Sequence, residues 1–172
     1  MGPLLCLDAN VLITIDTLGK DVKRRLGQWI GSGHIRIPEA VLREIKTHGA
    51  RPLRERLDRW QLRWPEFFVD IDTRNPSHCR ELARMSATYG QTFTFGGVHF
   101  PGGFYKTPQG KSRAVDAQLV TLAKVHGFTV VSDERAIQAA CSLENVSAMH
   151  MHEFIRRLVN EPIPGYQRLA LG

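Results

Sequence analysis

A short apolar run that ends in a carboxylate is the feature that most constrains the fold of this chain. Residues 4–7 are Leu-Leu-Cys-Leu, and Asp8 follows them directly. Four apolar residues are too few for a helix but are typical of a strand buried on both faces of a parallel sheet. In such a sheet, ligands bind at the carboxyl ends of the strands. The sequence therefore predicts Asp8 at the edge of a ligand site, and a second buried element from Val11.

The remainder of the chain alternates helix-like and strand-like segments. We expect helices over residues 21–30, 38–46, 51–63, 76–88, 114–124, 135–140 and 152–159, and further strands over residues 34–37, 67–71, 128–131 and 146–150. This alternation predicts an α/β fold, a three-layer α/β/α sandwich around a mostly parallel sheet of about five strands. We expect a single domain over residues 1–160, followed by a C-terminal tail over residues 161–172.

An insertion over residues 90–112 is rich in glycine and aromatic residues. Residues 91–95 and 98–100 predict a hairpin that turns at Gly96-Gly97. The aromatic side chains leave two alternatives open, packing of the hairpin against the body or stacking on nucleic-acid bases. They are Phe93, Phe95, Phe100, Phe104 and Tyr105, and the nearby Lys106, Lys111 and Arg113 are candidates for contacts with phosphates.

The composition restricts the class of protein. The formal charge of +6 and the pI of about 9.6 fit a polyanionic partner such as RNA. No apolar run approaches the roughly 20 residues of a membrane-spanning helix, and the first residues lack the layout of a signal peptide. Three cysteines without CxxC spacing argue against a disulfide framework and a thiolate zinc site. We therefore expect a cytoplasmic protein that does not associate with a membrane.

Several other acids fall where the predicted fold can bring them to Asp8. Asp133 and Glu134 follow the strand predicted at residues 128–131, Asp116 lies near the start of the helix before that strand, and Glu44 lies on the helix predicted at 38–46. Four of these acids have a simpler alternative: Asp8 or Asp133 as a cap of the helix that follows it, Asp116 as a first-turn acid, and Glu44 as a solvated helix residue. A capping role for Asp133 would leave Glu134 as the ligand.

Clustered carboxylates suit one chemistry in particular. Hydrolysis of a phosphodiester needs an activated water and a stabilised leaving oxygen, and one or two divalent cations can supply both. Mg²⁺ and Mn²⁺ prefer oxygen ligands, so they select aspartate and glutamate over histidine and cysteine. Acids that hold metals within a basic protein that holds phosphates are what a metal-dependent nuclease requires.

Four motifs resemble those of PIN-domain nucleases, in the order of that family and over nearly the whole chain. They are Leu-Asp-Ala-Asn-Val-Leu-Ile at residues 7–13, Ile-Pro-Glu-Ala-Val-Leu-Arg-Glu-Ile at 37–45, Val-Asp-Ala-Gln-Leu at 115–119, and His-Gly-Phe-Thr-Val-Val-Ser-Asp-Glu at 126–134. The resemblance implies a metal-dependent endoribonuclease, commonly the toxin of a bacterial toxin–antitoxin pair and often a homodimer. The insertion over residues 90–112 departs from the compact toxins of this family.

The resemblance also assigns roles to individual residues. It implies that Asp8, Asp116 and either Asp133 or Glu134 bind the metal, and that Glu44 is a ligand or orients the attacking water. It further implies that Asn10 and Ser132 support the site.

Other functions remain open beside the nuclease. One is a nucleic-acid- or protein-binding scaffold with this fold and little or no catalysis. A phosphatase of the haloacid-dehalogenase type also begins with a strand and an aspartate, but it needs a second aspartate where this chain has Asn10. A Rossmann dehydrogenase is disfavoured because no GxGxxG follows the first strand. The basic segment 51–63 is interpreted as a solvated helix face, with contact to RNA or to a partner as the alternative. His150 and His152 are interpreted as ordinary packing residues, because no third ligand for a zinc pair is evident.

Overall fold

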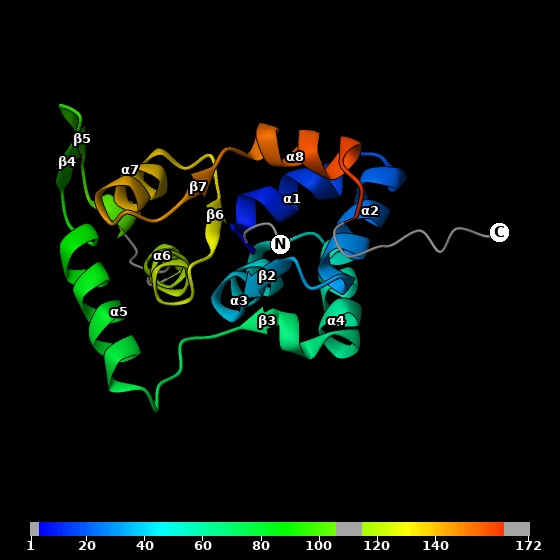
Figure 1. Cartoon of the computed structure of the whole chain (residues 1–172), viewed down its shortest axis with the longest axis horizontal. Helices are drawn as coiled ribbons and strands as arrows, with labels where there is room; N and C mark the ends of the chain where they lie inside the picture. Colours follow the sequence, from blue (N-terminus) through cyan, green and yellow to red (C-terminus); the bar gives the residue numbers. More distant parts are fainter. Residues whose placement is uncertain (1–3, 106–114, 164–172) are drawn as a thin grey trace.

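A parallel sheet forms the centre of the fold (Figure 1). The computed structural model describes residues 4–105 and 115–163, and within these residues five strands form the sheet in the order β3-β2-β1-β6-β7. The strands are β1 (Leu5–Leu7), β2 (Ile35–Pro38), β3 (Phe68–Val69), β6 (Thr129–Val131) and β7 (Ala148–Met149). All four neighbouring pairs are parallel. The α/β prediction and the parallel sheet are therefore confirmed.

The strand order contains a topological switch point beside β1. The chain adds β2 and β3 on one side of β1, then crosses the sheet and adds β6 and β7 on the other side. Helices that leave β1 and β6 consequently diverge at the carboxyl ends of these two strands. In open α/β sheets this divergence forms the crevice where ligands bind.

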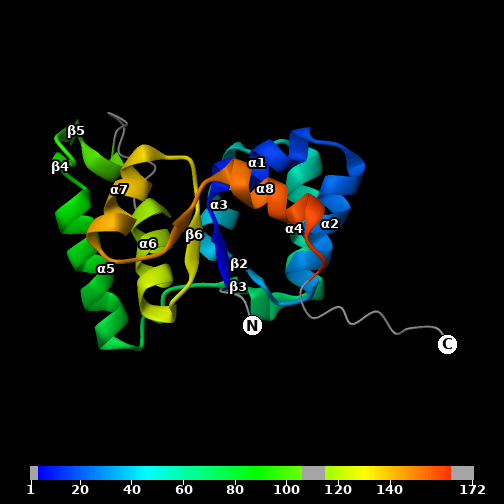
Figure 2. The same cartoon turned by 45° about the horizontal axis from the view of Figure 1, so that its top comes forward.

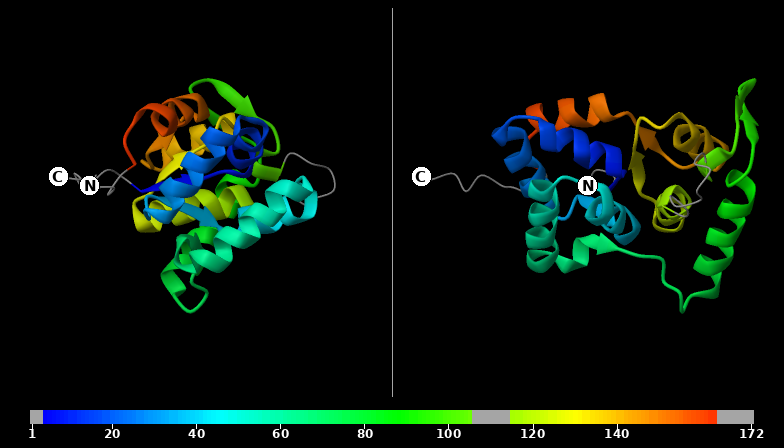
Figure 3. Two further views of the ribbon diagram at one scale, coloured as in Figure 1. Left: turned by 90° about the vertical axis from the view of Figure 1, so that its right-hand side faces the viewer. Right: turned by 180° about the vertical axis from the view of Figure 1, so that it is seen from behind.

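Helices cover both faces of the sheet and complete a three-layer sandwich (Figures 1 and 2). The described helices are α1 (Ala9–Thr17), α2 (Lys20–Gly31), α3 (Glu39–His48), α4 (Arg51–Arg63), α5 (Pro76–Tyr89), α6 (Val115–His126), α7 (Arg135–Leu143) and α8 (Met151–Asn160). One buried cluster draws on α1 to α4 and α8, and the other on α5, α6 and α7. Seen from behind, these two groups again lie on opposite sides of the strands (Figure 3). No helix in the described ranges has the length and apolar character to cross a bilayer.

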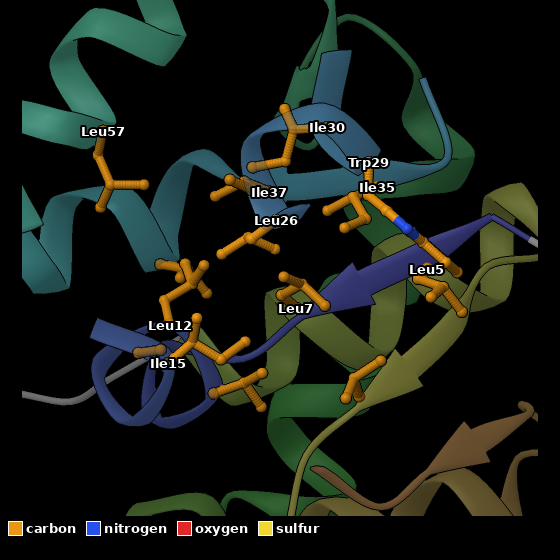
Figure 4. Close-up of a cluster of buried hydrophobic side chains, with 14 of the residues drawn as sticks. Leu5, Leu7, Leu12, Ile15, Leu26, Trp29, Ile30, Ile35, Ile37 and Leu57 are labelled. Atoms are coloured by element: carbon orange, nitrogen blue, oxygen red, sulfur yellow. The ribbon is translucent and has the colours of Figure 1, made fainter. Parts of the chain in front are cut away.

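Alternation along the central strands joins the two layers of core. Leu5 and Leu7 point into the first cluster, beside Leu12, Leu26 and other residues of α1 and α2 (Figure 4). Cys6 points into the second cluster and is fully buried. Because successive side chains of a strand point to opposite faces, a strand buried on both faces must be continuously apolar. This requirement is the physical reason why residues 4–7 predict the centre of the sheet.

The insertion forms the predicted hairpin, made of β4 (Phe93–Phe95) and β5 (Val98–Phe100), and then a 3₁₀ turn, η2 (Gly103–Tyr105). Gly96 and Gly97 join the strands with φ values of 56° and 77°. Two consecutive positive φ values define the two-residue turn that matches the twist of a hairpin, and glycine adopts them without steric cost.

The aromatic side chains of this insertion mostly pack against the body. Phe100 and Phe104 are 8% and 4% exposed. Phe93 stacks on Phe100 at a centroid distance of 4.9 Å and meets the edge of Tyr89 on α5 at 5.1 Å. The packing alternative is therefore confirmed for these three phenylalanines, although Phe93 keeps part of its ring exposed. Phe95 is exposed at 37%, and the side chain of Tyr105 lies outside the described residues.

Glu144, the residue that ends α7, ties the helices of the second layer together. It accepts hydrogen bonds from Arg84 on α5 at 2.5 Å, from the Tyr89 hydroxyl at 2.5 Å and from Lys124 on α6. Burial works to raise the pKa of Glu144, but these three donors outweigh it and lower the pKa to about 2. The cluster holds α5, which follows a long connection from β3, against α6 and α7.

Two predicted strands are shorter than expected. The strand expected over residues 67–71 is only Phe68–Val69, because residues Pro65–Phe67 form a 3₁₀ turn, η1, immediately before it. The strand expected over residues 146–150 is only Ala148–Met149, because His150 is already the N-cap of α8. Helix α8 ends at Asn160, close to the predicted start of the tail, and residues 164–172 lie outside the described part of the chain.

Candidate active site

The backbone of Asp8 is fixed at the switch point between β1 and β6. Its N–H donates to the carbonyl oxygen of Val131 at 3.1 Å, and its own carbonyl accepts from Val11 at 3.2 Å in the first turn of α1. The residue is only 4% exposed. Its side chain makes no capping hydrogen bond to α1, although it is the N-cap residue. Asp8 is therefore the N-cap residue of α1 by its place in the chain, as the simpler alternative expects, and the amides of Ala9 and Asn10 act on its carboxylate.

Ser132 connects Asp8 to the segment that follows β6. Its Oγ donates to Oδ2 of Asp8 at 2.8 Å and accepts from the backbone N–H of Glu134 at 3.0 Å. Ser132 is fully buried, and its own N–H donates to the Met149 carbonyl of β7 at 3.2 Å. One hydroxyl thus fixes the orientation of the Asp8 carboxylate and the path of the chain at Glu134. The resemblance to PIN-domain nucleases implies a supporting role for Ser132, and that role stays a prediction.

The charge on Asp8 is unfavourable in this position. Burial raises the pKa of its carboxyl above the ordinary value of 3.8. The hydrogen bond from Ser132 and the nearby amides of Ala9 and Asn10 work in the opposite direction, while the negative charge of Glu134 raises the pKa further. The net shift is upward, so a positive charge placed beside Asp8 would stabilise its ionised form.

Glu44 belongs to the same electrostatic group. It lies on the second turn of α3, which begins directly after β2, and it is half-buried. Burial raises its pKa, the charge of Asp8 raises it further, and His48 one turn along the helix lowers it. The charge of Asp8 therefore acts on this acid. Glu44 keeps part of its side chain in solvent, so the alternative of a solvated helix residue stays open beside the role in the site.

Asp133 and Glu134 differ in exposure and in their interactions. Oδ1 of Asp133 accepts from the backbone N–H of Met151 at 2.9 Å and contacts Nδ1 of His150 at 3.3 Å, so this exposed acid caps the start of α8. Glu134 is half-buried, and its charge acts on Asp8. Of these two neighbouring candidates, Glu134 raises the pKa of Asp8 by its charge, whereas Asp133 caps α8 and not α7, the helix that follows it in the sequence.

Asp116 reaches the same edge of the sheet by connectivity. Helix α6 precedes β6 after a short turn, so it runs antiparallel to that strand and its first turn lies at the strand's carboxyl end. Val115, beside Asp116, packs against the cluster that contains Leu7 and Val131. Asp116 is half-buried and makes interactions of its own. The topology therefore places Asp116 on the side of the sheet where Asp8 lies.

The acids do not form a complete set of metal ligands. In residues 4–105 and 115–163, no three aspartate, glutamate, histidine or cysteine side chains lie close enough to hold a metal ion as they stand. Their chemistry nonetheless fits a hard cation, because the group offers carboxylate oxygens and the buried Asp8 lies in a negative environment.

The remaining predicted site residues fall into two groups. Asn10 is exposed in the first turn of α1, and its support of Asp8 stays a prediction. Lys106, Lys111 and Arg113, the candidates for contacts with nucleic acid, lie outside the described residues.

One supporting residue was missed by the reasoning from sequence. The side-chain amide of Gln138 on α7 donates to the carbonyl of Ser132 at 2.5 Å. It thereby restrains the turn that carries Ser132 and Glu134. A glutamine on a helix gives no signal in the sequence that would reveal this contact.

Neither a protein-family model nor a curated protein sequence matches this chain. Among solved structures, it is similar to one described as the crystal structure of PAE2754 from Pyrobaculum aerophilum. The two share 14% sequence identity and a TM-score of 0.49, over 92% of this chain and 98% of that chain.

Proposed function

We propose that this protein is a metal-dependent endoribonuclease that hydrolyses RNA phosphodiester bonds with Mg²⁺ or Mn²⁺. The observation that carries the proposal is Asp8: a buried carboxylate at the switch point of the sheet, with a raised pKa and with Glu134 and Glu44 coupled to it. A fold does not bury an acid in a negative environment for stability, because that arrangement costs free energy. Such strained groups are concentrated at functional sites.

The roles follow from the positions of the acids. Asp8, Glu134 and Asp116 would hold the metal, and Glu44 would be a further ligand or would orient the attacking water. A divalent cation bound there would lower the pKa of a water and stabilise charge on the phosphate. Ser132 keeps the Asp8 carboxylate directed by its hydrogen bond of 2.8 Å. The excess of basic residues, with a net charge of +6, favours a polyanionic substrate.

Narrower aspects of this proposal come from the resemblance to PIN-domain nucleases. They are a toxin–antitoxin role with an antitoxin partner, a homodimeric assembly and a cytoplasmic location. A small adjacent reading frame with a DNA-binding pattern would support the toxin role, and sedimentation equilibrium would establish the assembly.

Cleavage of a mixed pool of single-stranded RNA with Mn²⁺ tests the activity. We expect Asp8→Asn and Glu134→Gln each to lower the rate by about 100-fold or more, because each removes a charge that the metal requires. Glu66→Gln is the matched control, since Glu66 is exposed in η1 before β3, at the opposite edge of the sheet. Equal rates for wild type and Asp8→Asn would refute the assignment.

Asp133→Asn separates the two neighbouring acids. An asparagine oxygen can still accept the hydrogen bond from the Met151 amide, so we expect this variant to retain the cleavage rate of the wild type. A loss equal to that of Glu134→Gln would assign a metal-binding role to Asp133 as well.

A second function is favoured by one specific observation. Because no three ligating side chains come together within the described ranges, a scaffold that binds RNA or a protein without cleaving it also fits the structure. Tight RNA binding by the wild type with no Mn²⁺-dependent cleavage would establish this alternative.

A further inference from the structure

A basic groove is lined by residues of α2 and α4. These two helices lie on the side of the sheet away from α5 (Figures 1 and 2). The volume of the groove is about 910 Å³. Six cationic side chains line it: Lys20, Lys23 and Arg24 from α2, and Arg56, Arg59 and Arg63 from α4. Within the described part of the chain, no aspartate or glutamate and no aliphatic side chain takes part in the lining.

The floor of the groove is built from two indoles set against two glycines. A Cβ placed on Gly27 would lie 3.3 Å from the ring of Trp60, and a Cβ on Gly31 would lie 2.6 Å from the ring of Trp64. The tryptophans of α4 therefore pack directly on the backbone of α2 and fix the spacing of the two helices. Each indole remains partly exposed, so the groove offers aromatic surface.

Only some of the positive charge is neutralised within the protein. Arg24 pairs with Asp21 at 2.9 Å, and Arg56 pairs with Asp16 at the end of α1. Among the described residues, Lys20, Arg59 and Arg63 have no carboxylate partner. Arg63 lies over the ring of Trp64 at 4.9 Å. The groove thus presents an excess of cations beside aromatic rings.

We propose that this groove binds single-stranded RNA, as a second contact surface beyond the carboxylates. The choice of RNA rests on the proposed nuclease function. Cations for phosphates and aromatic rings for bases are the two elements of single-strand recognition. An amphipathic acidic helix would instead seek aliphatic side chains for its apolar face, and the lining offers none among the described residues.

The position of the groove suits an extended strand. Helix α1 starts beside Asp8 and ends next to α2, and its nine residues span about 14 Å. RNA held at Lys20 and Arg56 therefore lies one short helix away from the acids. Bases bound in the groove would restrain the strand while a neighbouring phosphodiester occupies the carboxylate site.

The test measures binding in EDTA, where a metal-dependent reaction cannot proceed. Fluorescence anisotropy of a labelled single-stranded RNA is recorded over a series of salt concentrations for the wild type and for Arg59→Gln/Arg63→Gln. The control is Arg74→Gln/Arg80→Gln, which removes the same charge from exposed positions before and on α5. Circular dichroism and urea unfolding verify that both double variants fold.

We expect the groove variant to bind on the order of ten-fold more weakly and the control to bind like the wild type. Each lost phosphate contact lowers the slope of log K against log [salt] by about 0.7, so the groove variant should lose about 1.4. RNA should also quench tryptophan fluorescence, because Trp60 and Trp64 line the groove.

Equal affinities and salt slopes for the two double variants would overturn the inference. So would binding of poly-glutamate in the groove without binding of RNA. The proposed function can fail independently of the groove. If only the groove variant loses RNA binding, and the wild type shows no Mn²⁺-dependent cleavage, the groove is upheld and the nuclease is refuted. Cleavage by the wild type, together with unchanged RNA binding by the groove variant, would uphold the nuclease and refute the groove.

Discussion

Replacing Asp8 by asparagine should stabilise this protein at neutral pH, although it should abolish its activity. The substitution keeps the size of the side chain and an oxygen that can accept from Ser132, which now donates at 2.8 Å. It removes a negative charge from a site that is only 4% exposed. Most core substitutions destabilise, so an increase in stability would be a specific sign of a group retained for function.

The expected gain follows from opposing contributions. Burying a carboxylate costs several kcal/mol even after relaxation, and the charged hydrogen bond from Ser132 offsets about 1.5–3 kcal/mol of that. The neutral hydrogen bond to asparagine still contributes about 0.5–1.5 kcal/mol. We therefore expect Asp8→Asn to raise the free energy of unfolding by about 1–3 kcal/mol at pH 7. For a chain of this length that corresponds to an increase in Tm of roughly 3–9 °C.

The pH dependence of the free energy of unfolding has a definite sign. The pKa of Asp8 is higher in the folded protein than in the unfolded chain, so between the two pKa values the folded state binds more protons. The stability of the wild type therefore falls as pH rises through this window, and the full penalty is present above the folded pKa. Below about pH 3.9 Asp8 is neutral in both states. The advantage of Asp8→Asn should thus shrink as pH falls toward 4.

Urea unfolding of both proteins at several pH values between 4 and 8 measures this difference. Glu66→Gln serves as the control, and at its exposed position we expect a change within about 0.5 kcal/mol. Destabilisation of Asp8→Asn at pH 7, or a gain that does not change with pH, would show that the Asp8 charge is not strained.

Three further substitutions test the packing and charge arguments. Ser132→Ala should lower the free energy of unfolding by about 2–4 kcal/mol in urea, because Asp8 and an amide lose their hydrogen bonds, and an unchanged stability would contradict this. Glu144→Gln should cost about 2 kcal/mol at pH 7, and the loss should diminish below pH 4.5 and vanish near pH 2, because the lowered pKa stabilises the fold only while Glu144 is ionised; a loss that is constant with pH would refute this assignment. Gly31→Ala would place a Cβ 2.6 Å from Trp64 and should lower Tm, whereas helix propensity alone predicts a rise.

The sequence contains most of the information needed for the fold because the central strands are buried on both faces. Residues 4–7 are apolar without interruption, residues 128–131 are interrupted only by the buried Thr129, and each run ends at a polar group. This pattern identifies the neighbours β1 and β6 and places Asp8 and Glu134 at the same edge. The outer strands β3 and β7 have two residues each, too few for a periodic pattern to define their ends.

The details of the site depend on contacts that no local pattern encodes. Asp133 and Glu134 are equivalent in sequence, and only the position of α8, whose first amide binds Asp133, distinguishes them. The sequence of the basic segment 51–63 favours a solvated helix face, with contact to RNA or to a partner as the alternative. The segment lines a groove because Trp60 and Trp64 pack on glycines of α2, a pairing between distant segments.

Titration of the protein with Mn²⁺ by isothermal calorimetry tests the central claim most directly. If the acids at the carboxyl ends of β1 and β6 form a cation site, the wild type should bind Mn²⁺ with a Kd in or below the millimolar range. Asp8→Asn should bind on the order of ten-fold or more weakly, and Glu66→Gln should match the wild type. Absence of binding at millimolar Mn²⁺, or equal affinity in wild type and Asp8→Asn, would contradict the account.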